Sequence, residues 1–342
     1  MKRFLWAVLA AFLLTGCEIK QDEQMIPSNS FWPGWDSPLE QTLADGISSF
    51  SEKIYLPAEC KDQLDIAFWH ILCAKPEFFF LNGEYRYSLS EDTLIFSPSY
   101  TMTKSEALTY AEKLETISDG LLNGVSDALS TEDRALLLHD RLLHKLSYDQ
   151  KHASPLLDAL LAGCADCEGY ARAYQYLLQK AGIPALYVTG EANGGGHAWI
   201  IMECEDGTWY HVDPTWDDGE NTVSRAYFMQ NDSVFGRTHK IRPAVPGASY
   251  PSCTGEPHHF FAKRGIAITD AANMNEVVRR SFNEAASSET NTVEFCFPSG
   301  VSLDALSVLD PLVLTEAERR STTVRTRITA KNSYIVSYQI AS

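Results

Sequence analysis

The sequence is poor in basic residues and in long apolar runs. It has 28 Lys and Arg against 45 Asp and Glu, which gives a formal net charge of −17. Direct binding to nucleic acid or anionic lipid needs a basic surface, so this balance argues against both classes of partner. The apolar run at residues 4–14 is too short to span a bilayer. With 45% apolar residues among 342, the chain can still bury a large core.

The chain also lacks the patterns of common metal sites. Cys164 and Cys167 form one Cys-x-x-Cys pair, and no second such pair or spaced histidine pair completes a zinc site. No D-x-[DN]-x-[DN]-G run is present, which disfavours a calcium loop. We therefore expect no metal and no cofactor. The eight cysteines are irregularly spaced and specify no disulfide framework, and a redox pair of Cys164 and Cys167 remains an alternative interpretation.

The N-terminus has the pattern of an export signal. Lys2 and Arg3 precede the apolar run, which ends in LTGC at residues 14–17. This ending resembles the lipobox of bacterial lipoproteins, which implies cleavage before Cys17 and lipid attachment to its thiol. Each buried methylene adds about 0.8 kcal/mol, so several acyl chains form a stable anchor. We expect an extracytoplasmic protein that is lipid-anchored to the bacterial membrane, and the alternative is an ordinary secretory signal.

Three motifs between residues 163 and 218 carry the chemistry of the chain. CEGYA begins at Cys167, GGHAW contains His197, and HVDPTWDD contains Asp213. Residues 168–181 have apolar side chains at helical spacing, and the following Gly-Ile-Pro ends the pattern. We therefore expect Cys167 at a helix N-terminus, where the positive end of the helix dipole favours a thiolate.

The second and third motifs lie on a predicted β-hairpin over residues 197–213. Two runs rich in β-branched and aromatic residues flank Glu-Asp-Gly. A two-residue turn would place His197 and Asp213 on opposite faces of the hairpin. A three-residue loop with Gly207 in the left-handed conformation pairs residue 204 with 208 and puts both side chains on one face. We predict the three-residue loop.

The motifs and their order resemble the transglutaminase-like superfamily of papain-like cysteine enzymes, over residues 133–227. The resemblance implies an α+β fold in which the helix that carries the cysteine packs on an antiparallel sheet. It also implies a catalytic triad of Cys167, His197 and Asp213. Such a triad acts on peptide or protein amide bonds through an acyl-thioester, which water or an amine resolves by hydrolysis or acyl transfer. The expected partner is a peptide or protein substrate, with cell-wall peptide as one possibility.

Other residues are candidates for supporting roles. The backbone N–H of Cys167 is the expected first oxyanion donor, and the sequence does not assign the second. The resemblance makes Tyr148 a candidate for the substrate cleft. Trp199 and Trp216 are expected to pack the core or to form a wall of that cleft.

Each triad residue also has a purely structural interpretation. A cysteine at a helix start is often just buried, a strand histidine is often packed, and an aspartate before proline is often a turn former. His211 is the alternative base, because it shares a face with Asp213, and Asp217 and Asp218 are the alternative orienting carboxylates. His258 and His259 lie outside the motifs. A non-catalytic lipoprotein that binds a peptide or cell-wall strand in the same groove is the competing function.

The expected organisation has five parts. They are a signal peptide (1–16), a tether (17–38), an N-terminal α+β module (39–125), the catalytic core (126–240) and a C-terminal α+β module (241–342). The two modules are predicted to share the order αβαββ, over residues 39–100 and 275–340. Identities are too few to establish a repeat, so a chance alignment of α+β segments stays open. Between the modules we predict helices at 105–129 and 131–146, with Thr131 as the N-cap of the second. Within the C-terminal module we predict a short helix at 303–309.

Overall fold

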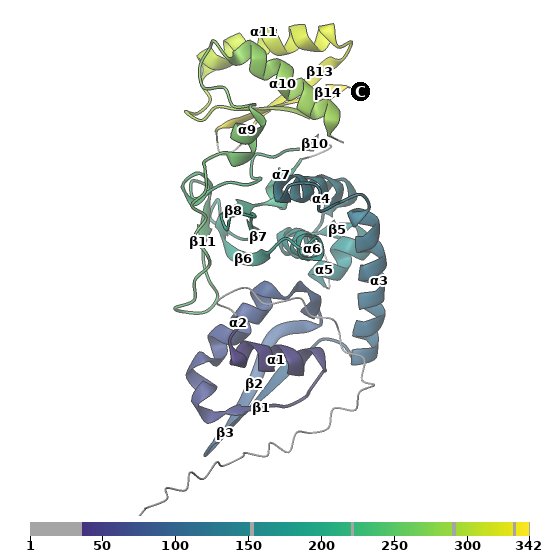
Figure 1. Ribbon diagram of the computed structural model, residues 1–342, viewed down its shortest axis with the longest axis vertical. Helices are drawn as coiled ribbons and strands as arrows, with labels where there is room; N and C mark the ends of the chain where they lie inside the picture. Colours follow the sequence, from purple (N-terminus) through teal and green to yellow (C-terminus); the bar gives the residue numbers. More distant parts are fainter. Residues whose placement is uncertain (1–35, 151–153, 220–221, 289–291, 331–332, 342) are drawn as a thin grey trace, which may run out of the picture.

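The computed structural model describes residues 36–150, 154–219, 222–288, 292–330 and 333–341. The molecule is elongated, with residues 38–100 at one end, residues 131–241 in the middle and residues 274–341 at the other end (Figure 1). The predicted signal peptide and Cys17 lie outside the described residues. Within the described ranges, no helix is long and apolar enough to cross a membrane.

The middle of the molecule is an antiparallel sheet with a helix packed on it. The strand order is β11-β6-β7-β8, formed by β6 (Ala185–Ala192), β7 (Gly195–Glu203), β8 (Trp209–Val212) and β11 (His239–Ile241). Helix α6 (Cys167–Lys180) packs on this sheet and buries Tyr170 and Tyr174 completely. The predicted fold class, a helix that carries Cys167 on an antiparallel sheet, is confirmed.

Short elements surround this sheet and helix. They are β4 (Ser147–Tyr148), α5 (Pro155–Leu157), a π-helical turn η3 (Asp158–Ala162), β5 (Cys164–Ala165), α7 (Pro214–Asp217), β9 (Asp218–Gly219), β10 (Thr222–Val223), α8 (Asp232–Phe235) and α9 (His259–Arg264). Strands β4 and β5 pair in parallel immediately before α6, and α7 follows β8 directly. β5 therefore leads directly into the helix that begins with Cys167, and α7 begins directly after Asp213.

The predicted hairpin register is confirmed. Strands β7 and β8 pair Ile200 with Val212 and Glu203 with Trp209, and the N–H of Cys204 donates to Thr208 O at 2.9 Å. Gly207 closes the loop at a φ of 81°, a left-handed conformation that glycine adopts without a steric cost. His197 and Asp213 therefore lie on one face of the hairpin.

Two helices before the catalytic stretch differ in detail from the prediction. Helix α3 (Lys104–Leu122) ends before Gly124, whose φ of 77° breaks the helix, so the predicted extension to residue 129 is wrong. Helix α4 (Thr131–Lys145) is capped by Ser130 rather than Thr131, because the Ser130 hydroxyl accepts from the N–H of Asp133 at 3.2 Å.

The two ends of the chain share one arrangement. The N-terminal module contains α1 (Pro38–Ser48), β1 (Ile54–Pro57), a 3₁₀ segment η1 (Ala58–Gln63), α2 (Leu64–Ala74), η2 (Pro76–Phe78), β2 (Leu81–Ser90) and β3 (Thr93–Tyr100), with strand order β1-β3-β2. The C-terminal module contains α10 (Met274–Ser287), β12 (Thr292–Cys296), α11 (Leu303–Arg319), β13 (Thr323–Thr329) and β14 (Ile335–Ala341), with strand order β12-β14-β13. Both follow αβαββ, and in both the last strand lies in the middle of the three-stranded sheet. The exact limits of the modules remain a prediction.

Helix α11 is longer than the predicted helix at 303–309. It continues through Pro311 to Arg319, although a proline inside a helix removes one hydrogen bond and costs about 3 kcal/mol. Leu309, Val313 and Ala317 recur every four residues and are all buried. Packing of this apolar stripe therefore outweighs the proline.

Candidate active site

Cys167 is the first residue of α6. Asp166 caps the helix, and its carboxylate accepts from the N–H of Gly169 at 3.1 Å. A side chain at Gly169 would approach Ala165 Cβ at 2.7 Å and Pro155 O at 3.0 Å, so glycine is needed for the close approach of this turn. The thiol is partly buried, at a helix end where unpaired N–H groups favour negative charge.

His197 joins the thiol to a carboxylate. Its Nε2 lies 2.8 Å from Asp213 Oδ2, which leaves Nδ1 as the ring nitrogen available to the Cys167 thiol. Burial opposes a charge on the imidazole, but the interactions with Asp213 and Cys167 outweigh burial and raise the pKa of His197 to about 9. The thiol, the imidazole and the buried carboxylate are thus brought together.

Asp213 is fully buried and uses both of its oxygens. Its Oδ1 accepts from the N–H groups of Thr215 and Trp216 at 3.0 and 3.2 Å, which makes Asp213 the N-cap of α7. Burial raises the pKa of the carboxyl, but the hydrogen bonds to His197 and His239 prevail, so its pKa is lowered. The carboxylate is held in one orientation by its own helix and by two imidazoles.

His239 is a site residue that the sequence analysis missed. Its Nε2 lies 3.0 Å from Asp213 Oδ2, and its Nδ1 lies 2.8 Å from the hydroxyl of Thr238. Burial lowers the pKa of His239, which favours a neutral ring that donates from Nε2 to Asp213. It comes from β11, 26 residues after Asp213, in a short HKI strand that carries no recognisable motif.

The two tryptophans near His197 differ in exposure. Trp199 has no exposed surface, stacks on His197 with a centroid distance of 6.1 Å, and donates its indole N–H to His211 Nδ1 at 3.0 Å. Trp216 is partly buried, with its ring 5.7 Å from His197 and 4.5 Å from His239. Trp199 therefore packs behind the histidine, whereas Trp216 has exposed surface beside it.

Tyr148 is 53% exposed on β4, and its ring lies 6.4 Å from that of Tyr170 on α6. This position is next to the helix that begins with Cys167.

The alternative base and orienting carboxylates have other partners. His211 uses Nδ1 for Trp199 and Nε2 for Asp232, at 2.9 Å. Asp217 Oδ2 lies 3.3 Å from His139 Nε2, and Asp218 accepts a hydrogen bond from the hydroxyl of Tyr170. None of these contacts leads to Cys167.

The remaining candidate residues are His258, His259 and Cys164 of the Cys-x-x-Cys pair. His258 packs on Tyr334, and burial lowers its pKa to about 4. His259 lies beside Tyr210. Cys164 and Cys167 are both free thiols.

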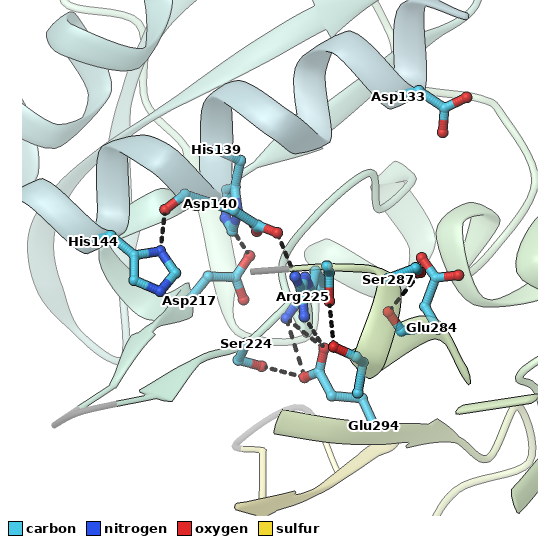
Figure 2. Close-up of polar contacts among 12 residues, drawn as sticks. Asp133, His139, Asp140, His144, Asp217, Ser224, Arg225, Glu284, Ser287 and Glu294 are labelled. Carbon is cyan, nitrogen blue, oxygen red and sulfur yellow. Dashed lines mark hydrogen bonds and ion pairs between the residues drawn. The ribbon is translucent and has the colours of Figure 1, made fainter. Parts of the chain in front are cut away.

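A buried polar cluster joins α4 and α7 to β12 of the C-terminal module (Figure 2). His139 on α4 lies 3.1 Å from Asp140 and 3.3 Å from Asp217. The guanidinium of Arg225 hydrogen-bonds Asp140 on one side and lies 3.7 Å from Glu294 of β12 on the other. Burial opposes charge on His139, but its two carboxylate partners outweigh burial and raise its pKa to about 9.

Two groups of side chains in the described ranges are spaced closely enough for a metal ion. They are His197, Asp213 and His239, and His211, Asp232 and Cys253. In the first group the histidine nitrogens face Asp213 through hydrogen bonds. In the second, the indole N–H that donates to His211 Nδ1 leaves the proton on Nε2, the atom that faces Asp232. The donor atoms of both groups are thus engaged with one another.

Part of the chain is similar to known proteins. A family model described as the Transglutaminase-like superfamily matches residues 115–214. Kyphoscoliosis peptidase is 28% identical over 155 residues in Mus musculus, covering 38% of this chain and 23% of that protein. Its Homo sapiens counterpart is 26% identical over 164 residues, with 41% and 25% coverage. The chain thus spans about a quarter of the length of these curated relatives.

Solved structures show a distant likeness. A crystal structure of a TGase has a TM-score of 0.30 and 13% identity, over 62% of this chain and 64% of that one. The periplasmic domain of TgpA from Pseudomonas aeruginosa has a TM-score of 0.25 and 20% identity, over 36% and 54%. The matched segment 115–214 holds Cys167, His197 and Asp213 together. The chain therefore contains a domain of the transglutaminase-like superfamily.

Proposed function

We propose that this protein is a cysteine enzyme that acts on peptide or protein amide bonds through an acyl-thioester on Cys167. The observation that carries the proposal is the placement of Cys167 beside His197, whose Nε2 is hydrogen-bonded to the fully buried Asp213. A groove that only binds a partner does not need a thiol, a base and an orienting carboxylate in this geometry. The printed name of the curated relatives, a peptidase, points in the same direction.

The residues divide the work of the reaction. His197 Nδ1 takes the proton of the Cys167 thiol, and the thiolate attacks the amide carbonyl carbon. The C–N bond then breaks as His197 returns the proton to the leaving amine, which leaves the acyl group on Cys167 as a thioester. Water or a second amine next attacks the thioester carbon while His197 takes its proton. The C–S bond then breaks, His197 returns the proton to the sulfur, and the acid or new amide leaves with the thiol restored.

Asp213 keeps His197 in the productive tautomer. Because Asp213 accepts from Nε2, the proton on that nitrogen stays in place and Nδ1 faces the thiol. The backbone N–H of Cys167, in the first turn of α6, is the first donor for the oxyanion. The neutral His239 holds Asp213 from the opposite side without adding charge to the site.

We favour hydrolysis over acyl transfer. We also propose where the enzyme acts. The lipobox-like residues 14–17 support an extracytoplasmic enzyme anchored through Cys17, acting on envelope peptides. Metabolic labelling with a fatty-acid analogue tests the anchor. Label should enter the wild-type protein and be lost in Cys17→Ser, and equal labelling of both would refute it.

The reaction is tested with peptides and mass spectrometry. The protein is incubated with a peptide library with and without a primary amine, and products are followed by mass. Shorter peptides with a new carboxylate indicate hydrolysis, and amine adducts indicate transfer. Cys167→Ala should abolish both, whereas Cys164→Ser should retain activity. Activity that needs Cys164 would instead support a thiol-disulfide oxidoreductase, and no products from the wild-type protein would reject the enzyme.

A further inference from the structure

A cavity of about 390 Å³ lies between the catalytic core and the C-terminal module. Its core side is formed by α7 and the β9–β10 pair, and its other side by the C-terminal sheet. Ile328, which lines the cavity on β13, is 47% exposed, so one wall reaches the protein surface. The volume is large enough for a few residues of a peptide.

The C-terminal sheet turns an unusually polar face to this space. The strand registers place Thr292 opposite Gln339, and Glu294 and Ile328 opposite Ser337, so these side chains share one face. Thr292, Gln339, Ser337 and Ile328 line the cavity. The hydroxyl of Thr292, a residue only 2% exposed, has no hydrogen-bond partner among the described residues. A polar buried face of this kind is suited to groups that supply hydrogen bonds rather than to an apolar core.

Trp216 links the cavity to the reactive thiol. Its ring contacts His197 with a centroid distance of 5.7 Å, and the same residue lines the cavity. An extended peptide advances about 3.3 Å per residue, so a chain bound at Cys167 passes Trp216 within two or three residues. The cavity therefore lies where a substrate continues beyond its reacting amide.

Charge and strand edges narrow the class of ligand. Among the described residues, the lining contains two carboxyl groups, Asp217 and Asp218, and neither lysine nor arginine. Burial raises the pKa of both carboxyls, and Asp217 lies 3.3 Å from His139 Nε2, so the described lining favours uncharged hydrogen-bonding groups over an acidic ligand. In the described sheets β10 pairs only with β9, and β13 only with β14, so both are edge strands at the cavity. Edge strands bind extended peptides through main-chain hydrogen bonds, which favours a peptide over a glycan.

We propose that this cavity binds an uncharged polar stretch of the peptide substrate, two or three residues from the amide that reacts at Cys167. The C-terminal module then supplies one wall of the substrate site, and selects serine, threonine, asparagine or glutamine over aspartate or glutamate. The inference rests on the proposed function, because it assigns the peptide bound there to the acyl donor.

The test measures binding separately from turnover. Acetylated and amidated nine-residue peptides, varied among Ser, Thr, Asn, Gln, Asp and Lys, are selected on the full chain carrying Cys167→Ala. Dissociation constants are then measured by calorimetry. We expect uncharged polar residues to be enriched, and an aspartate at a selected position to weaken binding about tenfold. Equal binding of acidic peptides, or retention of N-acetylglucosamine oligomers and no peptide, would overturn the assignment.

Variants at the exposed wall locate the site. Ile328→Trp fills the cavity from its surface side, and Gln339→Trp, which lies on the same face of the sheet and is only half-buried, is the second variant. Either should weaken peptide binding about tenfold. The matched control is Val308→Trp, because Val308 is also β-branched and 48% exposed but lies on α11 and outside the lining. It should bind like the parent.

The outcomes separate this inference from the enzyme itself. If the wild-type protein turns over peptides and both wall variants bind and react normally, the cavity assignment is wrong and the enzyme stands. If the wild-type protein turns over none, the proposed function fails, and with it the acyl-donor role of the cavity. A loss of binding in Val308→Trp equal to that in Ile328→Trp would also reject the cavity.

Discussion

The N-terminal and C-terminal modules share one order of elements and strands but are joined to the catalytic core in different ways. The N-terminal module has a separate apolar core, which includes Leu43, Phe68 and Phe96. The C-terminal module has none of its own, because Phe282 and Phe295 belong to the same buried cluster as Tyr174 of α6. The N-terminal module thus meets the catalytic cluster through Trp69, Cys73 and Ala74 of α2, whereas the core of the C-terminal module is continuous with that cluster.

The contacts at the two junctions differ in kind. On the N-terminal side, side chains of α6 satisfy the last carbonyls of α2: Arg172 donates to Leu72 O, Gln175 to Cys73 O at 2.6 Å, and Gln179 to Ala74 O at 2.8 Å. On the C-terminal side, the contact is made by burial of a strand. All five residues of β12 are buried, whereas residues of the equivalent strand β1 alternate between buried and exposed. Two modules with the same topology therefore differ in one respect. The N-terminal module keeps one sheet face open, whereas the C-terminal module packs its sheet against the catalytic core.

Breaking the buried charge at the C-terminal junction should have the largest effect. Arg225→Met leaves Asp140 and Glu294 buried without their cation, and should lower the free energy of unfolding by about 3–5 kcal/mol. Arg172→Met at the N-terminal junction removes a hydrogen bond to a carbonyl and a cation–π contact with the Tyr187 ring at 3.7 Å, and should cost about 1–2 kcal/mol. Urea unfolding measures both, and equal losses would contradict the comparison.

A cavity in each of the two cores should destabilise a different part of the molecule. Phe96→Ala and Phe295→Ala each remove a fully buried ring and should cost about 3–5 kcal/mol locally. Hydrogen exchange followed by mass spectrometry should show faster exchange only within residues 38–100 for Phe96→Ala. For Phe295→Ala, α6 and β7 should also exchange faster. Protection of α6 that stays unchanged would separate the C-terminal core from the catalytic one.

Alkaline pH should weaken the shared core. The pKa values of His197 and His139 are raised to about 9 from 6.5, so the folded state binds their protons more tightly than the unfolded state. Their contribution to stability is complete below pH 6.5 and is lost as pH rises through about 9. The free energy of unfolding should fall over this window, and less steeply in His197→Gln. If the free energy of unfolding depends on pH identically in that variant, His197 does not contribute to the pH dependence.

The smallest effect is expected on the open face of the N-terminal sheet. Tyr55 is 64% exposed on β1, so Tyr55→Ser should change the free energy of unfolding by no more than about 0.5 kcal/mol. A thermal or urea titration is sufficient. A loss above about 1 kcal/mol would mean that this face is covered, as its C-terminal counterpart is.

The sequence predicted what local rules determine. The helix that starts at Cys167 follows from apolar spacing and a helix stop, and the three-residue hairpin loop was predicted because it places His197 and Asp213 on one face. The fold class was predicted from the resemblance of the three motifs to a known family. The length of α11 was underestimated, because the proline rule is local and the packing that overrides it is not. The N-cap of α4 was misplaced by one residue, since Ser130 and Thr131 have equivalent capping chemistry.

Long-range partners could not be predicted. His239 reaches Asp213 only because β11 pairs with β6, and nothing near residue 239 indicates that pairing. The Arg225 contacts likewise join α4 to β12, across 85 and 69 residues of sequence. Single-sequence patterns describe each strand and helix, but they do not tell which buried polar groups will meet.

The central claim is that Cys167, His197 and Asp213 act as one unit. It is tested most directly by the rate at which iodoacetamide modifies each cysteine near neutral pH, measured by peptide mass in the wild-type protein and in His197→Ala. The account predicts selective modification of Cys167 ahead of Cys164, and loss of that selectivity in His197→Ala. Reaction of Cys167 at the rate of an ordinary free thiol in the wild-type protein, or no change in His197→Ala, would contradict it.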